Sequence, residues 1–186
     1  MRAYLIITLL VLFSGCISDQ SEQETQIEEE NIMEEISISS DAFKAGSSIP
    51  VEHTCDGEDR SPALSWDTIP TGTQSIALIV DDPDAPGKTW VHWVIYNIPA
   101  NTTGLPLGVP KNKTLDDGSL QGTNDFDRIG YNGPCPPPGK PHRYLFRVYA
   151  LDTTLNLKSG ATKSQLEAAM SGHILAQGEM IGKYGR

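Results

Sequence analysis

Several large protein classes are excluded by what this chain lacks. Its 186 residues hold 14 Lys and Arg against 24 Asp and Glu, and the basic residues form no cluster. A dedicated nucleic-acid binder needs grouped basic side chains to hold the phosphate backbone, so the sequence predicts no nucleic-acid partner. No internal repeat is present, and the apolar run at residues 3–13 is too short for a comfortable membrane-spanning helix.

Motifs for metal and nucleophilic chemistry are also missing. The three cysteines and four histidines form no H-E-x-x-H, no C-x-x-C and no close histidine pair, so a zinc site is disfavoured. No G-x-S-x-G sequence occurs, which argues against a serine hydrolase. We therefore expect no metal, no cofactor and no enzymatic activity.

An export signal opens the chain. Arg2 precedes the apolar run, and the small residues Ser14 and Gly15 precede Cys16, which is the layout of a signal peptide at residues 1–15. The string Phe13-Ser14-Gly15-Cys16 resembles a lipobox, in which the cysteine is acylated and becomes the new N-terminus, although Phe13 departs from the usual leucine. The alternative is an ordinary signal peptide with an incidental cysteine.

The next segment has the composition of a tether. Residues 17–35 contain eight acidic residues and no basic one, whereas residues 36–186 hold 16 acidic and 13 basic residues. A polar, acidic stretch without aromatic residues buries too little apolar area to fold. We expect residues 16–35, which begin at the lipidated cysteine, to be a disordered tether. It would hold a domain at residues 36–186 on the extracytoplasmic face of the cell membrane.

The remaining residues have the pattern of a β-rich domain, and the 17 glycines and 13 prolines favour turns over helices. The predicted strands are residues 36–39, 63–66, 75–81, 91–98, 143–151 and 176–184. One helix is predicted after the capping-box pair Thr162 and Gln165. Its helically spaced residues are Leu166, Ala169, Met170 and His173. The pattern favours a mainly β fold, a sandwich of mostly antiparallel sheets with a short C-terminal helix.

Candidate binding chemistry begins directly after the strand at residues 75–81. The loop reads Asp81-Asp82-Pro83-Asp84-Ala85-Pro86, and its prolines restrict the backbone. Because side chains alternate along a strand, Asp82 continues the face of Ile76, Leu78 and Val80 and is expected to point at the end of the sandwich. The alternative is a solvated turn that is capped by its own aspartates.

A second set of polar residues lies at the ends of other strands. His92 falls inside an apolar strand, where a satisfied core histidine is the more ordinary role, and His142 and Tyr144 share one face of the strand at 143–151. Together with the nearby carboxylates, these groups favour a small pocket for a phosphate- or carboxylate-sized anion, with Trp90 and Pro86 as apolar walls. A zinc ion held by His92, His142 and a carboxylate is the competing interpretation.

Two regions then stand out together. The first joins Asp82-Pro83-Asp84-Ala85-Pro86 to Trp90-Val91-His92-Trp93, and the second joins Gly130-Tyr131-Asn132-Gly133-Pro134 to Gly139-Lys140-Pro141-His142-Arg143-Tyr144. They resemble the two signature regions of the phosphatidylethanolamine-binding protein family, in particular its bacterial and archaeal Raf-kinase-inhibitor-like branch. The strings at 53–57, 61–66 and 122–126 agree as well, and the resemblance runs from about residue 37 to residue 184.

The resemblance implies a β-sandwich with a small pocket for phosphate, phosphoryl headgroups, acetate or similar anions. The pocket residues that it implies are Asp82, His92, Gly133, His142 and Tyr144, with Asp84 and Trp90 in support. Relative to eukaryotic members, the second region contains Cys135 and the prolines at 136–138, which offer no N–H donors to an anion. The family's C-terminal pocket-gating helix has no counterpart beyond Tyr184.

Cysteines and sequons fit an exported domain. If Cys16 is acylated, Cys55 and Cys135 remain, and two cysteines in such a domain predict one disulfide between them. Asn101 and Asn112 each begin an N-x-T glycosylation sequon, whose use depends on the organism.

The leading prediction is a membrane-tethered binding protein for a small anionic ligand that carries a phosphoryl or carboxylate group. Within the family, members regulate partner kinases and proteases, and an inhibitor of an external protease that uses the loop at 101–118 is compatible with the predicted location. One alternative is a hydrolase in which His92 or His142 acts as general base and Asp82 orients it. The other alternative is a purely structural envelope lipoprotein.

Overall fold

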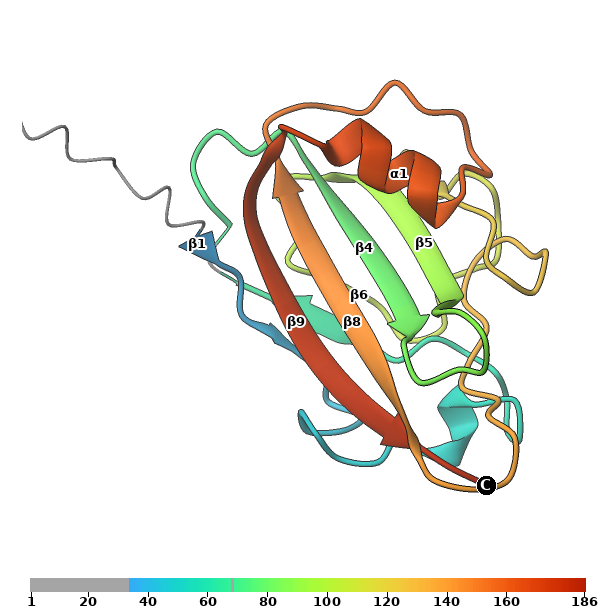
Figure 1. Ribbon diagram of the computed structural model, residues 1–186. Coiled ribbons are helices and arrows are strands. Elements are labelled where there is room, and N and C mark those ends of the chain that lie inside the picture. Colours follow the sequence, from blue (N-terminus) through green and yellow to red (C-terminus); the bar gives the residue numbers. More distant parts are fainter. Residues whose placement is uncertain (1–33, 68) are drawn as a thin grey trace, which may run out of the picture. The chain divides into compact units, whose positions relative to one another are not determined.

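The computed structural model describes residues 34–67 and 69–186 (Figure 1). The predicted signal peptide, Cys16 and nearly all of the predicted tether lie outside the described residues. Two residues of the predicted tether are described, and they form strand β1 (Glu34–Glu35), which pairs in parallel with Ala176 and Gln177. The folded part of the chain therefore includes two residues that precede the predicted domain boundary.

Two sheets make up the fold. The large sheet has the order β1-β9-β8-β4-β5-β7 and contains β4 (Ser75–Asp82), β5 (Trp90–Pro99), β7 (Leu120–Gln121), β8 (His142–Leu151) and β9 (Ile174–Tyr184). The small sheet consists of β2 (Ile38–Ser39), β3 (Leu64–Trp66) and β6 (Gly104–Leu105). All of these strands pair antiparallel except β1 with β9. The predicted mainly β sandwich is confirmed.

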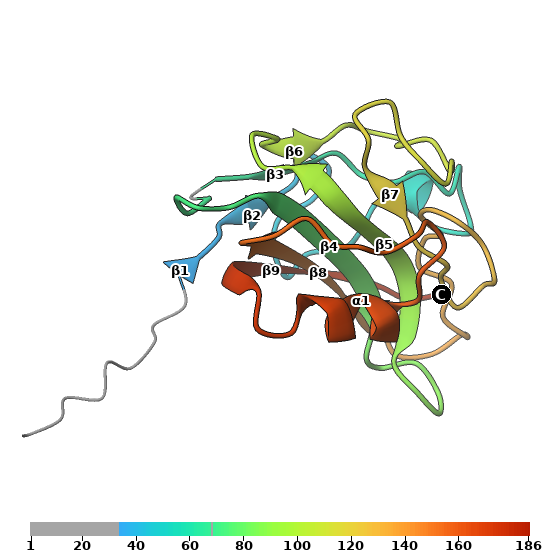
Figure 2. The same cartoon turned by 90° about the horizontal axis from the view of Figure 1, so that it is seen from above.

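The large sheet is covered on both faces (Figure 2). The small sheet packs on one face, and helix α1 (Lys163–Met170) packs on the other. Alternation along β4 divides its side chains accordingly, because Ile76, Leu78 and Val80 belong to the core on the side of the small sheet. Ala77 and Ile79 belong to the core beneath α1. Asp82 therefore follows the face between the sheets, as the sequence predicts, and Asp81 follows the face under the helix.

Helix α1 has the predicted capping box. The Thr162 side chain accepts a hydrogen bond from the Gln165 backbone N–H, and the Gln165 side chain accepts one from the Thr162 backbone N–H. The helix is shorter than the spacing of apolar residues predicts, because it ends at Met170 and Gly172 then takes a left-handed conformation (φ 80°). His173 therefore lies outside the helix. Within residues 34–67 and 69–186, no helix has the length and hydrophobicity that a bilayer crossing requires.

A disulfide joins Cys55 and Cys135, the pair that the sequence predicts. The Cα atoms are 5.4 Å apart, and the two residues are separated by 80 positions in the chain. Closing a loop of this length contributes roughly 4–5 kcal/mol to stability in the chain-entropy model. The bond ties the segment after the short 3₁₀ helix η1 (Val51–His53) to the proline-rich loop before β8.

Candidate functional site

A cavity of about 210 Å³ opens where β4 ends and where β5 and β8 begin. Because β4 is antiparallel to both neighbours, its last residues lie beside their first ones. The lining residues are Asp82, Ala85, Pro86, Trp90, His92, Phe126, Cys135, Pro136, Pro137 and His142. Four of the seven sequence-predicted binding residues line this one cavity: Asp82, Trp90, His92 and His142.

Asp82 and His142 form the polar centre of the cavity. The Asp82 side chain is 4% exposed, and its Oδ2 accepts a hydrogen bond from Nδ1 of His142 over 2.8 Å. Its Oδ1 accepts a second bond, also 2.8 Å long, from the backbone N–H of Asp84. An ionised carboxylate only accepts, so the first bond keeps the proton on Nδ1 of His142 and leaves Nε2 as the atom available to a ligand.

Asp84 lies at the rim and does not line the cavity. Its carboxylate accepts hydrogen bonds from Nε, Nη2 and the backbone N–H of Arg143, at 2.9, 2.7 and 2.9 Å. The Arg143 side chain is the main reason that the pKa of Asp84 falls to about 2. This pair joins the turn after β4 to the second residue of β8, and so holds Asp82 opposite His142.

We expect acid to weaken the Asp84–Arg143 pair. The pKa of Asp84 lies below its ordinary value of 3.8 in the folded protein, so its stabilising contribution is present above about pH 4 and is lost as the pH falls toward 2. Urea midpoints of the wild type and of Asp84→Asn should differ modestly above pH 4, because the pair is solvent-exposed, and should converge near pH 2. A gap that persists unchanged at pH 2 would contradict this assignment.

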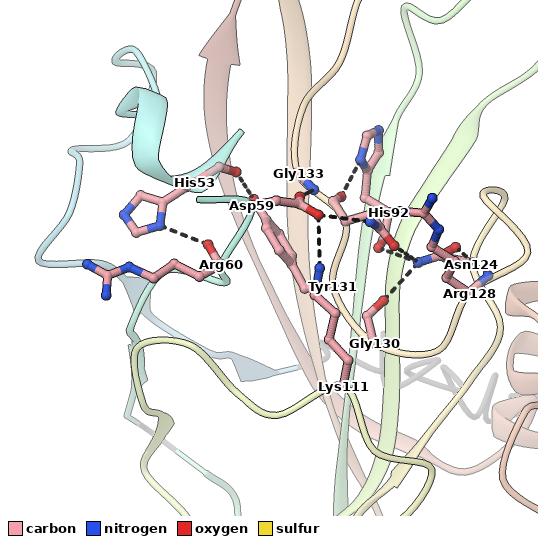
Figure 3. Close-up of polar contacts among 11 residues, drawn as sticks. His53, Asp59, Arg60, His92, Lys111, Asn124, Arg128, Gly130, Tyr131 and Gly133 are labelled. Carbon is pink, nitrogen blue, oxygen red and sulfur yellow. Dashed lines mark hydrogen bonds and ion pairs between the residues drawn. The ribbon is translucent and has the colours of Figure 1, made fainter. Parts of the chain in front are cut away.

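His92 occupies a buried position against the same cavity. Its Nδ1 donates to the backbone carbonyl of Asn132 over 2.6 Å, and its ring meets those of Phe126 and Tyr144 edge to face. Burial lowers the pKa of His92 and outweighs the opposing influence of the Asn132 carbonyl and the Asp82 charge. The ring is therefore neutral near pH 7, with its proton on Nδ1 and a lone pair on Nε2. Figure 3 shows the second ring nitrogen pointing away from the polar contacts around it.

Asn124 supports the segment that orients His92 (Figure 3). Its side-chain N–H groups donate to the carbonyl of Gly130 over 2.8 Å and to Oδ1 of Asn132 over 2.9 Å. Its side-chain oxygen accepts two backbone N–H groups of its own loop. The donors and the acceptor of the buried Asn124 amide are all engaged in hydrogen bonds, so the amide holds Asn132 in place. The backbone carbonyl of Asn132 in turn determines the tautomer of His92.

Asp59 is a further residue that the sequence did not single out. It has a positive φ of 53°, and its carboxylate accepts hydrogen bonds from the backbone N–H of Gly133, from Asn132 and from Lys111, at 2.6, 3.0 and 2.9 Å. The Gly133 N–H, which the resemblance implies as part of the anion site, is thus bound to Asp59. The strings at 53–57 and 122–126 indicated these neighbourhoods, but the resemblance assigned no role to Asp59 or Asn124.

Tyr144 lies beside His92 and not in the lining of the cavity. The residue is 1% exposed, and its hydroxyl lies near Asp82 but makes no hydrogen bond of ordinary geometry within the described part of the chain. Burial, and after it the negative charge of Asp82, raises the pKa of Tyr144, so the hydroxyl stays protonated. A buried O–H without an acceptor is costly, and an oxygen of a ligand or of water would relieve that cost.

Apolar side chains form the walls of the cavity. The rings of Trp90 and Phe126 meet edge to face with centroids 5.6 Å apart, and the ammonium of Lys88 lies 5.1 Å from the Trp90 ring centroid. The prolines at 86, 136 and 137 complete the walls. The polar groups of the cavity are therefore surrounded by apolar surfaces.

The proline-rich wall is fixed from two sides. The Cys55 N–H donates to the carbonyl of Pro134 over 3.0 Å, next to the disulfide. From the other side, Nε of Arg186 donates to the carbonyl of Pro136 over 2.8 Å, and Nη1 of Arg186 lies 3.4 Å from Asp56. Sequence reasoning gave no role to Arg186, because nothing in a one-dimensional pattern places it beside a loop 50 residues earlier.

The structure offers little to the zinc interpretation. In the described part of the chain, no group of three or more His, Cys, Asp or Glu side chains is placed to hold a metal ion. The Nδ1 atoms of His92 and His142 are both engaged with protein acceptors, which leaves one nitrogen on each ring. Metal-bound histidines often donate their other ring N–H in the same way, so the argument against zinc rests on the missing group of three ligands within residues 34–67 and 69–186.

Comparisons with known proteins agree with this fold. The model of the phosphatidylethanolamine-binding protein family matches residues 39–185. A UPF0098 protein of Methanothermobacter thermautotrophicus is 53% identical over 151 residues, which is 81% of this chain and 99% of that protein. A UPF0098 protein of Pyrococcus horikoshii is 45% identical over 182 residues, which is 96% of this chain and 86% of that protein.

Solved structures are similar over the same region. The crystal structure of Escherichia coli YbcL, described as a member of the mammalian phosphatidylethanolamine-binding protein family, superimposes with a TM-score of 0.77 at 36% identity and covers 82% of this chain and 99% of its own. A putative homologue from Chlamydia trachomatis gives a TM-score of 0.74 at 39% identity, with 82% of this chain and 98% of its own covered. The chain therefore belongs to the phosphatidylethanolamine-binding protein family, in the bacterial and archaeal branch of the UPF0098 and YbcL-like proteins.

Proposed function

We propose that the protein binds a small ligand through a phosphoryl or carboxylate group in the cavity at the ends of β4, β5 and β8. The observation that carries this proposal is the convergence of His142, positioned by Asp82, with His92 on one cavity of about 210 Å³. Each imidazole has one nitrogen bound to the protein and one left over, which suits a ligand that bridges the two rings. The name of the family, and that of the Chlamydia trachomatis homologue, supports a phosphoryl-bearing ligand.

A binding role is better supported than hydrolysis. The 2.8 Å bond between Asp82 and His142 has the geometry of a general base and its orienting group, which favours a hydrolase as the second candidate. The lining residues, however, include no serine or threonine, and the sulfur of Cys135 is held in the disulfide. A hydrolase would therefore need water as its nucleophile. Release of inorganic phosphate from phosphomonoesters that depends on His142 would favour the enzyme.

The cellular setting is part of the same proposal. The export signal, a lipidated Cys16 and the acidic tether would hold the domain on the outer face of the cell membrane, where a disulfide persists.

Asn101 and Asn112, the two sequon asparagines, are exposed, and so is Leu107 between them. This loop is the surface that we assign to an external protein partner such as a protease. A purely structural envelope lipoprotein would not need the polar centre described above.

Ligand titration of the full chain in detergent tests the binding site. Phosphate and phosphoethanolamine should each change the tryptophan fluorescence, because Trp90 lines the cavity. His142→Ala should weaken binding by about 10- to 100-fold, since it removes a hydrogen bond to a charged group. Its matched control is His173→Ala, which removes an exposed histidine whose Nδ1 is also 2.8 Å from an aspartate, Asp152. Equal affinities of the two variants would contradict the proposed site.

A further inference from the structure

The cavity has an unusual charge balance for an anion site. Its lining residues, all within the described part of the chain, contain one carboxylate and two imidazoles but no lysine or arginine. The nearest cations have other partners. Arg143 binds Asp84, and Lys88 binds Asp125 at 2.7 Å. Arg186 binds the Pro136 carbonyl and approaches Asp56.

His92 adds a hydrogen-bond acceptor to this cavity. Its only proton is on Nδ1 and is donated to the Asn132 carbonyl over 2.6 Å, so Nε2 carries a lone pair. Neutral His142 likewise has its proton on Nδ1, toward Asp82, and a lone pair on Nε2. A fully deprotonated oxyanion would therefore place its own lone pairs against two further lone pairs and beside the Asp82 charge. Binding is favourable only if a proton is present between the ligand and the rings.

We propose that this pocket selects oxyanions that carry a proton, and that Nε2 of His92 is the acceptor that determines this specificity. The ligand class is inorganic hydrogen phosphate and phosphomonoesters. The disfavoured class is sulfate, phosphodiesters and carboxylates, so the inference narrows the proposed function to its phosphoryl alternative. The ligand P–O–H donates to His92, and its other oxygens accept from His142 when that ring is protonated. This inference rests on the proposed function, since it names the ligands of the same site.

The charge state of the ligand gives the pH dependence. The titratable and charged groups around the two rings are Asp81, Asp82, Asp84, Arg143, Tyr144, Tyr184 and Arg186. Arg143 and Asp84 neutralise each other, and His92 stays neutral through burial. A phosphomonoester takes up its last proton near pH 6. Affinity for a monoester should therefore rise by up to about tenfold per unit as the pH falls from 8 to 6, with one proton taken up per ligand.

Isothermal titration calorimetry of the full chain at pH 8 and pH 6 tests the inference. The four probes are inorganic phosphate, sulfate, phosphoethanolamine and glycerophosphoethanolamine. Inorganic phosphate should bind at least about tenfold more tightly than sulfate at both values, because sulfate has no proton to donate. Phosphoethanolamine should bind more tightly than its diester, glycerophosphoethanolamine, and this pair separates a free phosphomonoester from a lipid headgroup as the source of the phosphoryl group. Titration at pH 8 in buffers of different ionisation enthalpy should count one proton more taken up with phosphoethanolamine than with inorganic phosphate, because inorganic phosphate already carries its proton at that pH.

Two further measurements locate the effect on His92. His92→Gln should lose the preference for phosphate over sulfate, because a side-chain amide can also donate, whereas His173→Ala should keep it. If His92→Gln fails to fold, the ¹⁵N shifts of the wild-type ring still decide, and they should show an unprotonated Nε2 that shifts when phosphate binds and not when sulfate is added.

The outcomes separate this inference from the proposed function. Sulfate that binds as tightly as phosphate, phosphoethanolamine binding at pH 8 without proton uptake, or a protonated Nε2 on free His92 would overturn the specificity and leave anion binding intact. A chain that binds none of the four probes would overturn both.

Discussion

Replacing Asp81 with alanine is expected to lower the free energy of unfolding by about 3–5 kcal/mol. The carboxylate is fully buried on the face of β4 that points toward α1. Both of its oxygens accept from Nη1 of Arg147 at 3.1 Å, and Oδ2 also binds the ammonium of Lys163, the first residue of α1. Removing the carboxylate leaves two half-buried cations facing each other without the anion that they share. Only the exposed carboxylates of Glu179 and Glu167 remain beside them, so the loss is larger than that of an exposed pair.

The control for Asp81 is an exposed ion pair in the same domain. Asp152 binds His173 at 2.8 Å, and both side chains are 46% exposed. Asp152→Ala should therefore change stability by only about 0–1 kcal/mol. Urea unfolding at pH 7, followed by circular dichroism, compares the two variants directly. Similar losses would mean that the buried cluster does not fasten α1 to the sheet.

Gly133→Ala is expected to cost about 1–3 kcal/mol of stability and to weaken phosphate binding. A Cβ at this position would lie 2.1 Å from the carbonyl oxygen of His53 and 2.8 Å from the Cα of Thr54, so the two backbones would have to separate. The Tyr131 hydroxyl, which donates to the same His53 oxygen over 2.7 Å, would be displaced. Since Asn132 is the preceding residue, the carbonyl that sets the tautomer of His92 would move as well.

Lys140→Ala is the matched control for Gly133→Ala, because Lys140 is exposed in the same loop. Urea midpoints report the loss of stability, and phosphate titration of the folded variants reports the site. We expect the glycine variant to change both readings and the lysine variant to change neither. A glycine variant with wild-type stability and affinity would show that the close backbone approach is not required.

The strands and half of the site were predictable because their signals are local. Alternation along 75–81 was enough to direct Asp82 between the sheets, and the shared face of His142 and Tyr144 followed from their spacing. The two histidines meet only because β4 lies between β5 and β8 in the sheet. No local pattern gives this strand order, and it was the resemblance to a known family that supplied it.

The missed residues depend on contacts between distant segments. Asp59 binds Gly133 from 74 positions away, and Lys163 binds Asp81 from 82 positions away. No periodicity in a single segment encodes such partners. The end of α1 was misplaced for the opposite reason, since a glycine conformation two residues beyond Met170 overrode an apolar spacing that continued to His173.

The fixed proline-rich wall has a consequence for how ligands enter and fit. Restricted proline backbones, a covalent link at Cys135 and the Arg186 hydrogen bond leave this wall few alternative shapes. The cavity should then have nearly the same shape with and without a ligand. Binding therefore costs little conformational entropy, and a few contacts are enough for measurable affinity. The same preorganisation sets an upper limit on size, because a rigid rim does not widen for bulky substituents next to the bound oxyanion.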